Sequence, residues 1–565
     1  MPLLSLITLL PLAAIPVLAL LPRRTPGTDK GVSLFFMGLT FVASLYLFLR
    51  FDGTSAQFQF LEDHAWIGSA IHYKVGVDGI SILLVLLTTF LSPIALLGAW
   101  RAIEDKAKEF CVAMLILETA MLGTLVALDM FLFYVFWELM LLPMYVIIGV
   151  WGGKRRIYAT VKFVLFTMVG SVLMLVGILY MYSRSGATTF DYVELLKMLS
   201  SQGGAGTLSV TEQVLLFLAF GLAFGIKVPL FPFHTWLPDA HVEAPTPGSV
   251  ILAGVLLKMG TYGLLRFAIP FFPEAAALAS APVICLAVIG IIYGSLVAYA
   301  QTDIKKLVAY SSVAHLGFVV LGMFVLTPDG IAGSVLQMVN HGLSTGALFL
   351  CVGFLYERKH TREISDYGGI ARVVPFFTAV FFIVVLSSIG LPGTNGFVGE
   401  FLILAGIFRE GVGSVVQAGS IVSWRNFVLL AGILAATGIV LGAVYMLTMF
   451  RQTMFGPVTH EENSRLADLT LREKLVALPV LALIVLIGVA PSLVLDKTQA
   501  TVDEYVRTYQ ARVMRTRNEA TAKRNDDAMK GLIQERIRDA VGGAVDLNNI
   551  QWELGPYKGK GAGND

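Results

Sequence analysis

Residues 221–238 read GLAFGIKVPLFPFHTWLP, which places Lys227, Pro229 and Pro232 inside a run of apolar residues. The run begins near residue 213 and is long enough to cross a hydrocarbon core of roughly 30 Å as a helix. Each proline removes a backbone hydrogen bond, so the carbonyls of Gly225 and Val228 are expected to be freed. Because lipid cannot satisfy a free carbonyl, this backbone must face protein or water. The stretch therefore predicts a broken helix inside a membrane protein.

The rest of the chain has the composition of a membrane protein. It has 565 residues, 56% of them apolar and 14% charged, whereas a soluble domain carries about 25% charged residues. Its mean hydropathy is +0.76, and hydropathy predicts about fourteen transmembrane helices. The expected fold class is therefore all-α and polytopic. The net charge of +2 gives no reason to expect a nucleic-acid partner. The three cysteines lie far apart, which excludes a disulfide framework and the spacing of a zinc or iron–sulfur site.

A second break is predicted in residues 386–401, LSSIGLPGTNGFVGEF, where Pro392 is flanked by glycines. With five spans per half, the two halves must have opposite topology, and paired broken helices are typical of inverted-repeat transporters. We therefore expect two inverted five-helix repeats. The predicted organisation is helices 1–3 with an outer loop (1–110), a first repeat (111–270), a second repeat (271–455), a last helix (456–496) and a charged tail (497–565).

Basic residues, Lys305 among them, are concentrated in the loops that follow odd-numbered spans, which the positive-inside rule places in the cytoplasm. Both termini should then lie on the outer side. In the tail, Val502, Val506, Tyr509 and their neighbours recur at helical spacing among charged residues, which predicts an amphipathic helix. Two interpretations stay open for this helix: it packs on the protein's own surface, or it docks a neighbouring subunit.

Several ionisable residues fall inside the predicted spans. A charge at mid-bilayer costs at least about 2.5–3.5 kcal/mol, so such residues usually have a function. Lys162 is close enough to a helix end to extend its ammonium towards water, whereas Lys227 and Lys258 are not. Burial disfavours the charged forms of acids and amines alike, which helps these groups to exchange protons. The candidate relay residues are Glu138, Lys227, Lys258, His315, His341 and Glu400, with Glu118 and Lys162 as secondary candidates.

The two histidines are expected to line a hydrated path. His315 shares a helix face with two serines, and His341 shares one with a glutamine and two hydroxyl residues. Neither has a carboxylate or a second histidine three or four residues away, so metal binding is not expected. The chain also lacks a phosphate-binding loop, a dinucleotide fingerprint and cysteines spaced for a cluster. An ion gradient or partner subunits must therefore supply the energy for transport.

Five motifs carry a resemblance to a known family. They are WELMLLPMYVIIGVWGG (137–153), the segment 225–263 that begins GIKVPLFPFHTWLPDAH, QTDIKKLVAYSSVAHLGF (301–318), VNHGLSTGALF (339–349) and GLPGTNGFVGEF (390–401). Together they resemble the antiporter-like M subunits of bacterial respiratory complex I, the proton-pumping NADH:quinone oxidoreductase. The resemblance implies fourteen helices in the bacterial inner membrane beside the homologous L and N subunits. It also implies that this chain holds no cofactor and that NADH, FMN, iron–sulfur clusters and quinone bind to other subunits.

The resemblance also implies a role for each candidate. Glu138 matches the essential glutamate of the fifth helix, and Lys227 matches its presumed partner in the broken seventh helix. Lys258 matches the central connecting lysine, His315 and His341 match residues of the central hydrophilic axis, and Glu400 matches the glutamate of the outer half-channel.

Three other functions are compatible with parts of the sequence. A membrane subunit of a multisubunit Na⁺/H⁺ antiporter would share the fold. Family resemblance implies, however, that such subunits carry a lysine at the position where this chain has Glu400. Related hydrogenase-type complexes fit the motifs 137–145 and 391–401 less well. A passive scaffold would have no reason to keep charges in the membrane.

Overall fold

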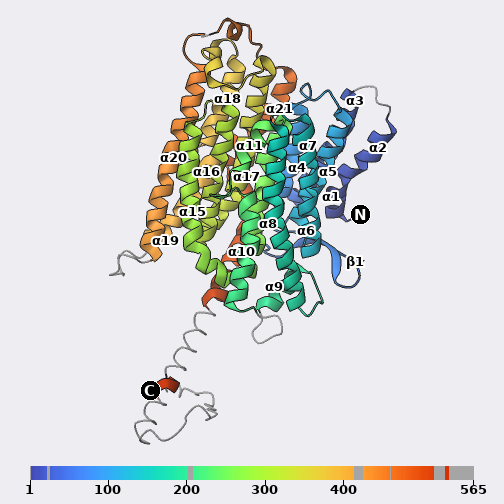
Figure 1. The fold of residues 1–565 in the computed structure, drawn as a ribbon, viewed down its shortest axis with the longest axis vertical. Coiled ribbons are helices and arrows are strands. Elements are labelled where there is room, and N and C mark those ends of the chain that lie inside the picture. The colour runs from blue at the N-terminus through green and yellow to red at the C-terminus, as the bar shows by residue number, and fades with distance from the viewer. Residues whose placement is uncertain are drawn as a thin grey trace, which may run out of the picture. The chain divides into compact units, whose positions relative to one another are not determined.

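The computed structural model describes residues 2–21, 26–200, 208–412, 424–458, 460–514 and 529–532. The chain divides into two compact units, Met1–Tyr509 and Gln510–Asp565. The first unit is a bundle of helices that run side by side (Figure 1). Two short strands lie at one end of this bundle, which we call the hairpin end. The opposite end carries the loops around residues 152–155, 300–303 and 360–372, and we call it the loop end.

The first half of the bundle contains the first eight predicted spans. Asp129 separates the fourth from the fifth, because its carboxylate caps the next helix by accepting from the N–H groups of Phe131 and Leu132. The elements are α1 (Leu3–Leu9), η1 (Leu10–Ala13), α2 (Ala14–Leu20), α3 (Pro26–Arg50), α4 (Ser81–Gly98), α5 (Ala107–Val126), α6 (Met130–Leu139), α7 (Leu141–Trp151), α8 (Arg156–Arg184), α9 (Tyr192–Ser200), α10 (Val210–Lys227), α11 (Trp236–Glu243), α12 (Thr246–Ile251), η2 (Leu252–Leu256), α13 (Leu257–Gly263), η3 (Leu264–Ala268) and α14 (Ile269–Phe271).

The second half contains the other six. Its elements are α15 (Pro273–Tyr299), α16 (Ile304–Val325), α17 (Pro328–Lys359), η4 (Ile364–Asp366), η5 (Ile370–Arg372), α18 (Pro375–Ser388), α19 (Asn395–Val412), α20 (Trp424–Met454), η6 (Glu461–Arg465), α21 (Leu471–Val489) and α22 (Ser492–Leu495). Among the described residues, twelve helices are long and apolar enough to cross a membrane. The broken pair α18–α19 and helix α21 occupy the two remaining predicted positions, so the predicted polytopic α-helical fold is confirmed.

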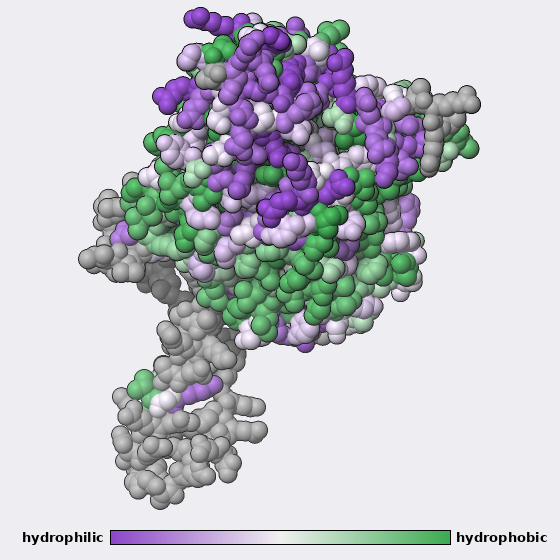
Figure 2. Space-filling view, turned by 45° about the horizontal axis from the view of Figure 1, so that its top comes forward, coloured by the Kyte–Doolittle hydropathy of each residue, from purple (hydrophilic) through white to green (hydrophobic). Residues whose placement is uncertain are grey.

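The helices form a buried core and a lipid-compatible periphery. The span from α12 to α14 and helix α17 are completely buried over their most apolar stretches, whereas only 28% and 33% of the residues in the corresponding stretches of α3 and α20 are buried. The exposed side chains of the outer helices are largely apolar, and they form a hydrophobic belt below the hydrophilic loop end (Figure 2). His315 and His341 therefore lie in helices that contact protein rather than lipid, and the Glu400 side chain is itself buried.

A β-hairpin, which the sequence analysis did not predict, covers the hairpin end. Strand β1 (Gln59–Ile67) pairs antiparallel with β2 (Ile71–Val77), and Val75 forms a bridge to Ala127 after α5. Lys74 on β2 forms ion pairs with Asp191 and Asp63. Burial acts to lower the pKa of Lys74, but the two carboxylates outweigh burial and raise it. The hairpin is thereby tied to the loop that precedes α9.

A buried ion pair fixes the start of α4 to the eighth span. The Arg266 guanidinium donates to Asp78, and both side chains are almost completely buried. We expect Asp78→Asn to lower the free energy of unfolding by about 3–5 kcal/mol, because it leaves the guanidinium buried without a counter-charge. Thermal unfolding in detergent measures this, with the exposed Asp52→Asn as control. An unchanged midpoint would show that the pair contributes nothing to stability.

The start of the tail packs on the protein's own surface. Residues 499–514 are helical, and Val502, Val506 and Tyr509 are buried. The Gly79 N–H donates to the Thr501 hydroxyl at 3.1 Å. The first turns of this helix therefore close the hairpin end of the bundle, and nearly all of the tail beyond residue 514 lies outside the described residues.

Candidate functional site

The first predicted break lies between α10 and α11, and the two predicted prolines fall in the turns that separate them. The Gly225 carbonyl was expected to be free, but it accepts from the Leu230 N–H at 2.8 Å. The Trp236 indole N–H donates to the Ile226 carbonyl at 2.9 Å. Protein groups thus replace the helix hydrogen bonds that the prolines remove, which stabilises a helix end at Lys227 inside the bundle.

The second break lies between α18 and α19, on either side of Pro392. Gly390 and Gly393 have φ angles of 73° and 91°, which L-residues rarely adopt. Two amides hold the break against α17: Asn340 Nδ2 donates to the Asn395 carbonyl at 2.7 Å, and Asn395 Nδ2 donates to the Asn340 carbonyl at 3.3 Å. The break is therefore bonded to the helix that carries His341.

Glu138 and Lys227 lie near one another without forming an ion pair. Glu138, on α6, accepts a hydrogen bond from the Ser171 hydroxyl and interacts with Lys227 through space. The buried Nζ of Lys227 has no hydrogen-bond partner among the described residues. It lies 5.2 Å from the centroid of the Trp137 ring and 5.7 Å from that of Phe163. A proton carried by Lys227 is thus stabilised by two aromatic rings and by a carboxylate that lies beyond hydrogen-bond distance.

Lys258 lies in α13 between two π-helical turns, η2 and η3, a local geometry that is frequent at functional sites. Its ammonium donates to the Ala253 carbonyl, and its Nζ lies 2.6 Å from Nδ1 of His341 on α17. An ammonium has no acceptor, so Nδ1 must be the accepting nitrogen. This contact joins the first predicted repeat to the second.

His315 and Glu400 form the next pair. Nδ1 of His315, on α16, lies 2.9 Å from Oε1 of Glu400 on α19. Gln337 Nε2 donates to the same oxygen at 3.1 Å. All three side chains are buried, so groups of α16 and α17 both bond to the carboxylate of the second broken helix.

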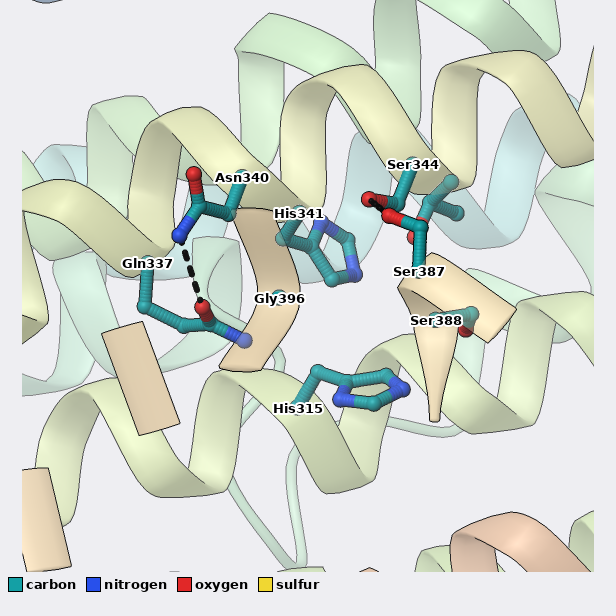
Figure 3. A pocket seen from close by; sticks show the side chains of 9 residues that line it. His315, Gln337, Asn340, His341, Ser344, Ser387, Ser388 and Gly396 are labelled. Atoms are coloured by element: carbon teal, nitrogen blue, oxygen red, sulfur yellow. Dashed lines mark hydrogen bonds between the residues drawn. The ribbon is translucent and has the colours of Figure 1, made fainter. Parts of the chain in front are cut away.

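A small polar cavity separates the two histidines. It measures about 10 Å³, and its lining residues are His315, Gln337, Asn340, His341, Ser344, Thr345, Ser387, Ser388 and Gly396. Figure 3 shows the imidazoles on either side of this space, with Ser388 beside it. Their ring centroids are 5.9 Å apart. Nε2 of each ring and the Ser388 hydroxyl have no hydrogen-bond partner among the described residues. A volume of this size holds about one water molecule, which three such groups can bind.

The two secondary candidates lie apart from this line. Glu118, on α5, is completely buried, and the Ser92 hydroxyl is the polar group that interacts with its carboxylate. Lys162, on α8, pairs with Asp239 of α11 at 2.7 Å and is partly exposed. The ion pair with Asp239 therefore accounts for the charge of Lys162 without a role in proton transfer.

Several polar residues of this region were not predicted from the sequence. His241, on α11, is completely buried, neither ring nitrogen has a hydrogen-bond partner among the described residues, and it stacks on Phe349 at 4.6 Å. The feature of the sequence that could have identified His241 is its position soon after the proline break. Lys305 was counted as a loop residue, but it is buried at the start of α16. In the described part of the chain, no three His, Cys, Asp or Glu side chains are grouped so as to hold a metal ion.

Comparison with known proteins assigns the family. The family described as "NADH:quinone oxidoreductase/Mrp antiporter, TM" matches residues 127–425. The chain is 48% identical over 518 residues to NADH-quinone oxidoreductase subunit M of Rhodobacter capsulatus, covering 90% of this chain and 97% of that protein. The chain belongs to this family.

Solved structures agree with membership of the NADH:quinone oxidoreductase/Mrp antiporter family. A chain of respiratory complex I from Thermus thermophilus with bound NADH matches with a TM-score of 0.78 and 33% identity, covering 90% of this chain and 99% of that chain. A chain of the Mrp complex from Dietzia sp. has the same fold, with a TM-score of 0.74 and 18% identity over 90% of this chain and 100% of that chain. Within the family, the fold is thus shared by both kinds of complex, whereas sequence identity is higher to the respiratory subunits.

Proposed function

We propose that this chain is a proton-translocating subunit of the membrane arm of an NADH:quinone oxidoreductase. The observation that carries the proposal is the line of buried groups Lys258–His341–cavity–His315–Glu400, in which consecutive side chains lie within hydrogen-bond distance except across the cavity. Amines, imidazoles and carboxylates are the groups that accept and release protons in such relays. The names of the relatives given above and the lengths they share with this chain support the same assignment.

A proton crosses the second half through these groups in turn. It passes from the Lys258 ammonium to Nδ1 of His341, and the imidazole releases a proton from Nε2 into the cavity. One water molecule there would take it and pass a proton to Nε2 of His315. His315 then delivers a proton from Nδ1 to Oε1 of Glu400, from which it leaves. Each imidazole can accept on one nitrogen and donate from the other, so each relays a proton without moving.

Glu138 and Lys227, in the first half, control when a proton moves along this line. Because no ion pair joins them in the described structure, the charge on Lys227 depends on how far Glu138 lies from it. Closing that distance stabilises a proton on Lys227, and opening it releases the proton. While Lys227 is charged, electrostatic repulsion between its ammonium and that of Lys258 would drive the proton of Lys258 towards His341.

We propose that redox chemistry on other subunits supplies the energy and that no redox cofactor binds to this chain. NADH, FMN, iron–sulfur clusters and quinone would bind to those partners. The three cysteines are dispersed over α5, α15 and α17, so they cannot form a cluster site.

Homologous L and N subunits are the proposed neighbours. Glu138 is only half-buried within this chain, although it lies in a membrane-spanning helix. A carboxylate at that depth cannot be left against lipid without a large cost. A neighbouring membrane subunit that covers α6 and α8 would remove this cost and bring its own polar groups towards Glu138.

The bacterial inner membrane is the proposed location, with the hairpin end and both termini on the outer side. Lys154 and Arg155 lie in the loop between α7 and α8, Arg156 begins α8, and Arg358 and Arg362 lie near the end of α17 and in the loop after it, so all five belong to the loop end. The positive-inside rule then places the loop end in the cytoplasm and directs proton transport outward.

Replacing the last group of the line tests the function. Glu400→Gln is expected to lower NADH-driven proton pumping about tenfold in reconstituted vesicles. This loss is smaller than the roughly 10²–10⁴ attributed to an indispensable acid–base group, because a second small cavity, lined by His315 and Glu400, leaves room for a water molecule to accept the proton of His315. Glu410→Gln, at the far end of the same helix, is the control. Pumping at the wild-type ratio of protons to electrons in Glu400→Gln would contradict the proposal.

A further inference from the structure

The carboxyl end of α11 is bound by two cations from the other repeat. A helix leaves its last four carbonyls without intrahelical partners. Here the Val242 carbonyl accepts from Arg362 Nη1 at 2.6 Å, and the Ala244 carbonyl accepts from Lys305 Nζ at 2.5 Å. Cations at a helix carboxyl end also interact favourably with the helix dipole. We call Lys305 and Arg362 the α11 clamp.

The clamp residues are held as one unit by the loop end of the second repeat. The Ile304 N–H donates to the Arg362 carbonyl at 2.9 Å, and the Ile364 N–H donates to the Thr302 carbonyl at 2.8 Å. The Arg362 guanidinium also pairs with Asp303 at 3.2 Å. A shift of this loop would therefore move both cations together.

The first repeat fixes the same helix end from the other side. The Gly153 N–H donates to the Glu243 carbonyl at 2.9 Å, and the Arg155 N–H donates to a Glu243 carboxylate oxygen at 2.8 Å. The end of α11 is therefore the point at which the loops of both repeats meet, and it can respond to a movement of either.

The clamp lies one turn from a buried histidine that faces the relay. His241 is three residues before Ala244, and both Lys305 and Lys258 act on it electrostatically. Its backbone carbonyl accepts from the Ser249 hydroxyl at 3.1 Å, which anchors it to α12. A proton that comes from the loop end and reaches Lys258 through His241 must therefore pass the Lys305 ammonium.

We propose that Lys305 is a positioning residue that controls proton uptake from the loop end, and this inference rests on the function proposed above. While its ammonium binds the Ala244 carbonyl, α11 stays closed against α16, and a like charge repels protons from His241. When the loop moves and the ammonium leaves the carbonyl, the end of α11 opens and protons reach His241 and then Lys258. Arg362 remains bonded to the Val242 carbonyl, so the end of α11 stays attached to the loop and can close again.

The test compares Lys305→Met, Lys305→Gln and Lys305→Arg in the complete reconstituted complex. A pH-sensitive dye follows the decay of an imposed pH gradient without NADH, and then proton pumping with NADH. We expect Lys305→Met and Lys305→Gln to speed the passive decay about tenfold, the size of effect that one focused charge has on local ion concentration, and to lower the proton-to-electron ratio. Lys305→Arg, which keeps the charge and the donor, should restore both.

Lys306→Met is the matched control, because Lys306 is adjacent, has the same charge and takes no part in the clamp. If Lys305→Met fails to assemble, Lys305→Gln is decisive, because it keeps a donor for the carbonyl and removes only the charge. Wild-type decay and wild-type ratio in an assembled Lys305 variant would overturn the inference. Loss of pumping in Lys258→Met alongside normal Lys305 variants would reject the clamp and keep the proposed function, whereas normal pumping in Lys258→Met would reject the function itself.

Discussion

Lys227→Ala is expected to abolish NADH-driven proton pumping, with a loss of about a hundredfold or more, and to slow quinone reduction strongly. The reason is the isolation of its ammonium between the Trp137 and Phe163 rings, where among the described residues no other amine, hydroxyl or carboxylate bonds to it. No neighbouring group can therefore take over its proton. Glu138→Ala should have the same effect, because the two residues act through their mutual distance.

Vesicle acidification and quinone reductase rates of the purified complex measure this prediction. Lys197→Ala, at an exposed position on α9, removes a lysine outside the membrane and serves as the control. Subunit content of the purified complex shows that the variant assembles. A normal ratio of protons pumped to electrons transferred in Lys227→Ala would refute the assigned pair.

Lys258→Met should stop transport between the two repeats, again by about a hundredfold. Its Nζ lies 2.6 Å from His341 Nδ1 and is completely buried, so this contact is a junction that bulk water does not bypass. Methionine keeps most of the side-chain volume and removes the proton. Met259→Leu, a volume-conserving change in the same turn, is the control for packing.

A double-mutant comparison sharpens this second prediction. If Lys258 and His341 act as one unit, the double variant Lys258→Met/His341→Phe should pump no worse than either single variant. Losses that multiply would show that the two residues contribute independently of one another, and the line proposed here would then be wrong at its first step.

Sequence alone identified the membrane-spanning helices, both breaks and the family, because each depends on local chemistry. Uninterrupted apolar runs need no tertiary information to be identified as spans, and a proline removes its hydrogen bond wherever the chain places it. The roles of Glu138, Lys227, Lys258, His315, His341 and Glu400 stay predictions, since geometry shows proximity and not proton transfer.

Other features could not be predicted from local patterns. The two π-helical turns around Lys258 have no sequence signature, and the hairpin of β1 and β2 lies in a segment too polar to stand out in a hydropathy analysis. Lys305 was counted as a loop residue because it follows a span boundary, and only the packing of α16 against α11 shows that it is buried.

The amino-acid sequence determined that this protein lies in a membrane, that two of its helices are broken and that ionisable groups lie within its spans. These properties follow from the free-energy cost of exposing charges and unbonded carbonyls to hydrocarbon. That cost depends on the chemistry of each residue and not on its neighbours in the fold. Tertiary structure decided which of those groups meet. Lys258 reaches His341, and His315 reaches Glu400, because helices distant in the chain pack together, and contacts over 83 and 85 residues of sequence separation leave no trace in local spacing.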